Sequence, residues 1–243
     1  MAADKHSIFY QPVNDVWTEV APAVGLDEVF PVLPEHVVMS LFVFVVVCVL
    51  GGVLRLRMRR TEPGWFQQLF EIIVQALSNM LEDVIGHGAA KRFLPLIGGF
   101  ALFIFLSNLC GHFFFLQPPT QSPWVTFALS ITACVIYHVL GVREHGIGYV
   151  KQFLGPGPPP VWLWPLMFLL EILSHLARVL SLGVRLYGNI FGEHVAVGVF
   201  FALVPFLLPL PLMALGLFAA FIQTFIFIML TSVYIAGAEA SEH

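Results

Sequence analysis

The sequence predicts an all-α integral membrane protein with five transmembrane helices, one amphipathic interfacial helix and a long, strongly tilted last helix hairpin. Hydrophobic residues make up 58% of the chain and charged residues only 11%, whereas a soluble domain carries about 25% charged residues. Mean hydropathy is +0.88. Long apolar stretches alternate with short charged or proline-rich segments, which is the pattern of a chain that crosses a bilayer repeatedly.

Five apolar stretches are predicted to cross the bilayer as helices. The first, residues 36–54, has about the length needed to span the hydrocarbon core. The fourth, residues 163–203, would be ~61 Å long as one helix, roughly twice the hydrocarbon thickness, so we expect it to tilt steeply or break. The other three are residues 93–116, 124–141 and 212–238, and the last of these forms the long hairpin with the fourth.

Residues 64–86 are predicted to form a helix of another kind. Apolar side chains recur there at helical spacing, opposite a face of glutamine, serine and glutamate. Such a helix lies along the membrane interface with its apolar face in the acyl boundary. Packing against helices of a partner subunit is the alternative.

The charges predict the orientation, because cytoplasmic loops collect lysine and arginine. The N-terminal tail, residues 1–35, has six acidic residues against Lys5 and is expected outside, with the C-terminus in the cytoplasm. The basic residues that flank predicted spans, and therefore mark the cytoplasmic side, are Arg55, Arg57, Arg59, Arg60, Lys91, Arg92, Arg143 and Lys151.

Arg185 is a cation in the middle of the fourth predicted span, and ionisable residues at bilayer depth are costly and mark functional sites. Glu171, Arg178 and Arg185 recur every seven residues and therefore share one face of a helix. Ser174, His175 and Asn189 lie on or beside this face. The pattern indicates charge handling inside a membrane.

The ionisable side chains divide into two kinds. A guanidinium is effectively never deprotonated, so Arg185 can attract a carboxylate and repel cations but cannot relay protons. Glu171 and His175 toward the cytoplasmic end, and Glu193 and His194 toward the external end, can gain and lose protons. Every acid outside this helix falls in a tail, loop or interfacial segment. We therefore expect the carboxylate partner of Arg185 to come from another chain.

Several alternatives stay open from the residues alone. Asn189 and Gln223 either hydrogen-bond the guanidinium and water or join helices to each other. The histidines His112 and His138 either pack or line a half-channel. A transporter would show an internal repeat, which the sequence lacks. A haem protein would need paired axial ligands from His112, His138, His175 and His194. The three cysteines lie in apolar stretches and are interpreted as small hydrophobes, with no metal or cofactor expected.

Three motifs resemble subunit a of the rotary F-type ATP synthase. The run Ser181–Asn189, SLGVRLYGN, is similar to the family's SLGLRLFGN signature. Residues 223–234 resemble its last helix, and Phe105–Leu109 resembles its FLMNL element. The resemblance extends from about residue 36 to the end of the chain.

The resemblance implies a non-catalytic stator subunit without cofactors, in a bacterial inner membrane. It implies two offset half-channels that load and unload carboxylates of the c-ring, which couples proton flow to rotation and ATP synthesis. Implied partners are the c-ring at the Arg185 face, the b subunits of the peripheral stalk, the remaining F1Fo subunits and lipid, with no nucleic acid. Whether the ion is a proton or sodium is left open.

The resemblance also implies roles for single residues. Arg185 matches the essential arginine that faces the c-ring, Glu171 and Ser174 match polar residues of the cytoplasmic half-channel, and Asn189 and Gln223 match the amides near the arginine. Further positions expected in or near the half-channels are Asn108, His112, His138 and Arg178.

The external half-channel departs from the family pattern. His194 occupies a position filled by Glu or His in relatives, but Glu193 stands where glycine is usual, and Gly216 where some relatives have histidine. Which of Glu193 and His194 titrates is left open. Gly111 replaces a common acid, for which His112 is a candidate substitute.

Overall fold

A computed structural model describes residues 7–24, 32–57, 64–113, 115–146, 149, 163–204, 207 and 209–239. Over these ranges it contains seven α-helices and one short 3-10 helix, and no strand. The predicted all-helical class is therefore confirmed. Arg59, Arg60 and Lys151, three of the predicted cytoplasmic charges, lie outside the described residues.

Five helices are long and apolar enough to cross a membrane, as predicted. They are α2 (Glu35–Arg57), α4 (Ala89–Cys110), α5 (Pro123–His145), α7 (Trp164–Leu203) and α8 (Pro209–Glu239). The last helix begins three residues before the predicted span start at 212. Pro209 opens α8, where proline's missing N–H is not needed.

Helix α4 also begins earlier than predicted, and the reason is a cap supplied by α3 (Trp65–Val84). The Glu82 carboxylate accepts hydrogen bonds from the backbone N–H groups of Gly88 and Ala90, at 2.9 and 3.1 Å. These bonds hold the pKa of Glu82 below its usual value. They also satisfy donors that a helix start leaves unpaired.

The predicted N-terminal tail contains a helix, α1 (Tyr10–Val24). Asn14 fastens it to the chain before α2: the Leu33 N–H donates to Asn14 Oδ1 at 2.8 Å, and Asn14 Nδ2 donates to the Leu33 carbonyl at 3.3 Å. Phe9 stacks on Phe42 of α2, with ring centroids 4.5 Å apart. The tail prediction missed this helix, because its anchors are contacts distant in sequence.

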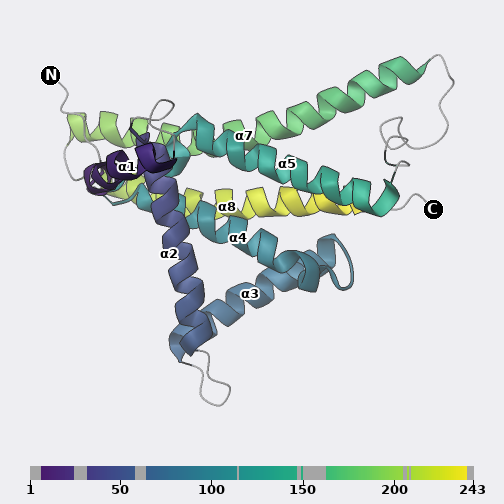
Figure 1. The fold of residues 1–243 in the computed structure, drawn as a ribbon, viewed down its shortest axis with the longest axis horizontal. Helices are drawn as coiled ribbons and strands as arrows, with labels where there is room; N and C mark the ends of the chain where they lie inside the picture. Colours follow the sequence, from purple (N-terminus) through teal and green to yellow (C-terminus); the bar gives the residue numbers. More distant parts are fainter. Residues whose placement is uncertain are drawn as a thin grey trace.

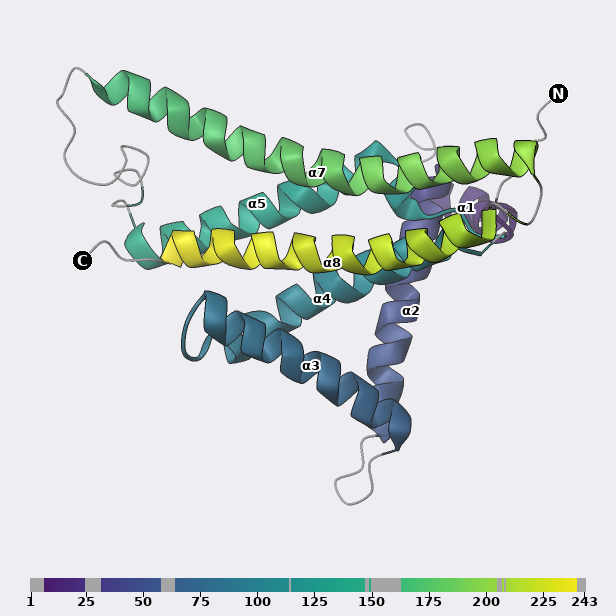
Figure 2. The same ribbon diagram turned by 180° about the vertical axis from the view of Figure 1, so that it is seen from behind.

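Helices α4, α5, α7 and α8 pack together, while α2 runs across their direction (Figure 1). Helices α7 and α8 lie together at their connected ends and diverge toward the start of α7 (Figures 1 and 2). The interfacial position of α3 and the tilt of α7 and α8 in a bilayer remain predictions.

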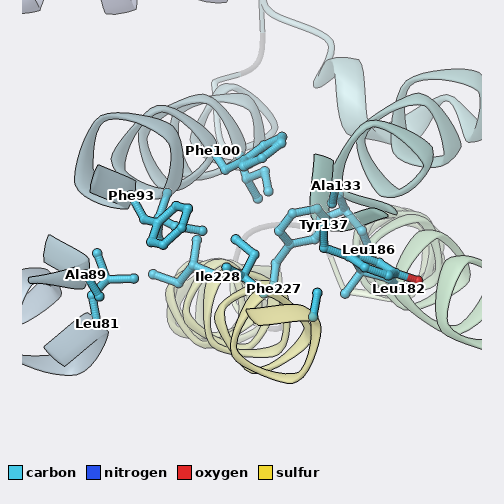
Figure 3. Close-up of a cluster of buried hydrophobic side chains, with 14 residues drawn as sticks. Leu81, Ala89, Phe93, Phe100, Ala133, Tyr137, Leu182, Leu186, Phe227 and Ile228 are labelled. Atoms are coloured by element: carbon cyan, nitrogen blue, oxygen red, sulfur yellow. The ribbon is translucent and has the colours of Figure 1, made fainter. Parts of the chain in front are cut away.

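The core joins five helices, α3, α4, α5, α7 and α8, through interlocking side chains (Figure 3). Phe227 of α8 is fully buried and lies 5.7 Å from the ring of Phe100 on α4. Gly183 lets α7 approach α5 closely: a Cβ there would lie 2.8 Å from the Phe127 ring. Such close approach over small residues is how helices associate where lipid removes the hydrophobic driving force.

Candidate functional site

Arg185 lies on the side of α7 that the rest of the chain leaves uncovered. The buried residues of α7 are Leu182, Gly183, Leu186 and Ile190, and they form its inward face. Arg185 is exposed, and its guanidinium donates to Ser181 Oγ, one turn earlier, at 3.3 Å. Among the described residues, no carboxylate forms an ion pair with it. The expectation that this chain supplies no partner acid therefore holds for this part of the structure.

The candidates predicted on the external side, His112, Glu193 and His194, gather at a cavity of about 810 Å³, here called the external cavity. His112 Nε2 lies 3.3 Å from Glu193 Oε1 and 3.1 Å from the Met213 carbonyl. Both side chains of the His112–Glu193 pair are 13% exposed, so the pair is largely screened from solvent. His194 lines the same cavity. The structure thus brings together the three external residues singled out from the sequence.

The two departures at 193 and 216 fit each other in space. A Cβ on Gly216 would lie only 1.9 Å from Glu193 Oε1. The Glu193 carboxylate therefore occupies the volume that any side chain at position 216 would need. Gly111 is similarly close to His194, whose Nε2 would lie 3.0 Å from a Cβ there. Glycines at both positions make room for the external titratable groups.

A second cavity, of about 300 Å³ and here called the cytoplasmic cavity, is lined by Glu171 and His175, which are predicted to lie toward the cytoplasmic end of the helix. Glu171 Oε1 lies 3.3 Å from His175 Nε2, and His175 Nδ1 lies 2.8 Å from the Tyr137 hydroxyl of α5. The Arg178 guanidinium lies over the Tyr234 ring of α8, 5.3 Å from its centroid. The remaining lining residues are Tyr149, Val233, Gly237 and Ala238.

The comparisons with known proteins bear on this arrangement. A family model described as "ATP synthase A chain" matches residues 37–236. The chain belongs to this family. "ATP synthase subunit a" of Geotalea uraniireducens (strain Rf4) is 42% identical over 184 residues, covering 76% of this chain and 79% of the relative. "ATP synthase subunit a 1" of Syntrophotalea carbinolica is 44% identical over 194 residues, covering 79% and 81%.

The match to the ATP synthase A chain family begins after α1, so it covers Arg185 and most of the residues that line the two cavities, but not the N-terminal helix. Ser7 and Ile8, just before α1, nevertheless line the external cavity. Sequence reasoning missed them, because nothing in their local pattern indicates that the N-terminal segment packs beside residues near position 200.

In this member of the ATP synthase A chain family, sequence reasoning also missed two tyrosines at the cytoplasmic cavity. Tyr137 contacts His175 directly and is 2% exposed. Tyr149, which follows the end of α5, lines the cavity and has its pKa raised chiefly by burial. Tyr137 lies in an apolar stretch, where tyrosine usually signals packing, and Tyr149 lies in a basic segment, so only the contacts reveal these positions. His138, which the sequence suggests either packs or lines a half-channel, has its ring 4.6 Å from that of His175 but is not among the residues that line the cavity.

The amide candidates are not joined to Arg185 by any hydrogen bond in the described part of the chain. Asn108 is fully buried, and its Oδ1 accepts from the Thr120 hydroxyl at 2.8 Å. The buried amide nitrogens of Asn108, Asn189 and Gln223 have no hydrogen-bond partner within the same residues. Such buried donors are rarely left unpaired in a folded protein. Ser174 is half-buried and lines neither cavity.

Proposed function

We propose that the chain is the ion-translocating stator subunit of a rotary ATP synthase, with two offset proton half-channels that serve carboxylates on a c-ring. The observation that carries the proposal is the uncovered Arg185, which has no acidic partner in the described chain and stands between two cavities. Each cavity contains one carboxylate–histidine contact. The relatives named "ATP synthase subunit a" support the same assignment.

Protons enter at the external cavity, and Glu193 is the group that receives them. Its carboxylate is held beside His112 and over Gly216, whereas no such pair holds His194 among the residues that the structure describes. A carboxylate that alternately gains and loses a proton can pass it to a ring carboxylate facing α7. His194 and the buried amides of Asn189 and Gln223 keep the route from Glu193 to the ring carboxylate polar.

Arg185 separates the two half-channels. Its permanent charge favours the ionised form of a ring carboxylate opposite it and repels a proton that would cross directly. The protonated carboxyl therefore leaves through the lipid, and the ring turns. Each elementary charge moved through the membrane supplies about 2.3 kcal/mol per 100 mV, so the subunit itself needs no covalent catalysis and no cofactor.

Protons leave through the cytoplasmic cavity by way of Glu171 and His175, with Ser174 and Arg178 nearby. The subunit acts with the c-ring, the b subunits and the remaining F1Fo subunits in a bacterial inner membrane, its N-terminus outside and its C-terminus in the cytoplasm. Helix α3 lies at the cytoplasmic interface, and the α7–α8 hairpin is strongly tilted against the ring.

The test replaces Arg185 by alanine in the assembled complex. ATP-driven proton pumping and passive proton leak are measured in membrane vesicles, normalised to the amount of complex. We expect pumping to be lost while assembly persists, and passive leak to continue or increase. Arg143→Ala, at an exposed arginine outside both cavities, is the matched control. Coupled pumping that survives Arg185→Ala would refute the proposed function.

A further inference from the structure

At the cytoplasmic cavity, a chain of polar contacts runs from α5 to α7. The Cys134 thiol donates to the Tyr137 hydroxyl at 3.3 Å, both on α5. The Tyr137 hydroxyl lies 2.8 Å from His175 Nδ1 on α7. On the other side of the imidazole ring, His175 Nε2 lies 3.3 Å from Glu171 Oε1. The chain therefore ends on the carboxylate assigned above to proton release.

The second contact to Nδ1 decides how the ring is protonated. Arg178 Nη1 lies 3.4 Å from the same nitrogen, and a guanidinium can only donate hydrogen bonds. The Arg178 contact therefore favours an Nδ1 that offers its lone pair, and in that form the Tyr137 hydroxyl donates to it as well. A neutral imidazole with a bare Nδ1 has its proton on Nε2. This nitrogen is the one that lies 3.3 Å from Glu171 Oε1.

The surroundings of Tyr137 hold its hydroxyl in place. The side chain is 2% exposed and belongs to the core that joins α5, α7 and α8. Its ring lies 4.4 Å from that of His138 and 5.8 Å from that of Tyr234 (Figure 3 shows Tyr137 within the core). A buried, packed ring cannot swing its hydroxyl away, so the donor to Nδ1 is permanent.

We propose that Tyr137 is a positioning residue of the cytoplasmic proton path: its hydroxyl, with Arg178, holds His175 in the tautomer that presents an N–H to Glu171. The proposal rests on the proposed function, since it gives His175 and Glu171 their role. The tautomer of a working histidine is commonly set by the hydrogen bond to its other nitrogen. Without the hydroxyl, only the longer Arg178 contact of 3.4 Å still favours a bare Nδ1. The other tautomer then gains population, and in it a lone pair faces the Glu171 carboxylate.

The first test measures pumping by the whole complex carrying Tyr137→Phe. We expect ATP-driven pumping per assembled complex to fall about three- to ten-fold, the effect of losing one neutral hydrogen bond. In a His175→Gln background the same substitution should have no further effect, because Tyr137 acts through His175. Tyr187→Phe is the control: this tyrosine of α7 stacks on Phe191 and lines neither cavity. Unchanged pumping in Tyr137→Phe, or an equal loss in the His175→Gln background, would overturn the proposal.

The second test observes the tautomer itself and does not depend on the pumping rate. Solid-state nitrogen NMR is recorded on the complex with 15N-histidine in this chain only, and the His175 signals are identified by their loss in His175→Gln. We expect a protonated Nε2 and a bare Nδ1 in the unmodified chain, and a mixture of both tautomers in Tyr137→Phe. The same tautomer in both samples overturns this inference alone, whereas pumping by Arg185→Ala overturns the proposed function.

Discussion

Replacing Gly216 by alanine is expected to disable the external half-channel while leaving the protein folded. The new Cβ would lie 1.9 Å from Glu193 Oε1, and ordinary contact begins at 3.4 Å. The carboxylate must therefore withdraw by about 1.5 Å. Its contact with His112 Nε2, now 3.3 Å, cannot be kept if the oxygen moves away from α8, since His112 also contacts the Met213 carbonyl of that helix.

The expected effect of Gly216→Ala on stability and on pumping depends on which atoms must move. The clashing atom is the end of a flexible side chain, and alanine in a helix is favoured over glycine by roughly 0.5–1 kcal/mol. Stability should therefore change little. A misplacement of about 1 Å at a reacting group, however, can slow a reaction by about 100-fold. We expect proton pumping to fall by about 10- to 100-fold with a normal amount of assembled complex.

The assay is ATP-driven acidification of inverted membrane vesicles, with the assembled complex quantified in the same membranes. Gly99→Ala is the matched control, because that helical glycine of α4 has open space at its Cβ position. Adding Glu193→Asp to Gly216→Ala should restore part of the pumping, since the carboxylate is one methylene shorter. Normal pumping by Gly216→Ala at normal assembly would contradict the reasoning, and so would a loss that Gly99→Ala shares.

Three further changes test other parts of the structure. His112→Ala should lower pumping by about 10-fold through the loss of the Glu193 contact; an unchanged rate would remove His112 from the path. Gly183→Leu should destabilise the chain by about 1–3 kcal/mol through its clash with Phe127, measured as a lower thermal midpoint, and an unchanged midpoint would refute the close approach. Glu82→Gln should lower the midpoint at neutral pH only. Because the folded pKa of Glu82 is depressed, its stabilisation is present above the ordinary pKa and lost as pH falls through the folded value. A difference that persists in acid would count against the cap.

The spans were predictable because lipid imposes simple requirements on length and polarity. Any helix that crosses about 30 Å of hydrocarbon must be long and apolar, and α7 meets this over 40 residues. The helix limits were less predictable. Helix α4 begins at Ala89 because Glu82, on the preceding helix, caps it, and such a side-chain contact leaves little trace in an apolar pattern.

The candidate site was predictable wherever a residue is chemically out of place. Arg185, Glu171 and Glu193 are ionisable groups within an apolar stretch, so their cost in a membrane marks them without any structure. Tyr137 is not marked in this way, because tyrosine is common in buried cores. Its importance follows from the 2.8 Å contact with His175, which depends on how α5 packs against α7.

Sequence alone was therefore sufficient for the membrane class, the number of spans, the family resemblance and the cation at the centre of the fourth span. These properties depend on composition, segment length and short motifs, all of which can be read from neighbouring residues in the sequence. Tertiary structure was needed to show that Glu193 fills the space above Gly216 and contacts His112, and that His175 is held between Tyr137 and Glu171. The contacts of Glu193 with the Gly216 position and of Tyr137 with His175 join different helices, and such contacts depend on packing that no single helix specifies.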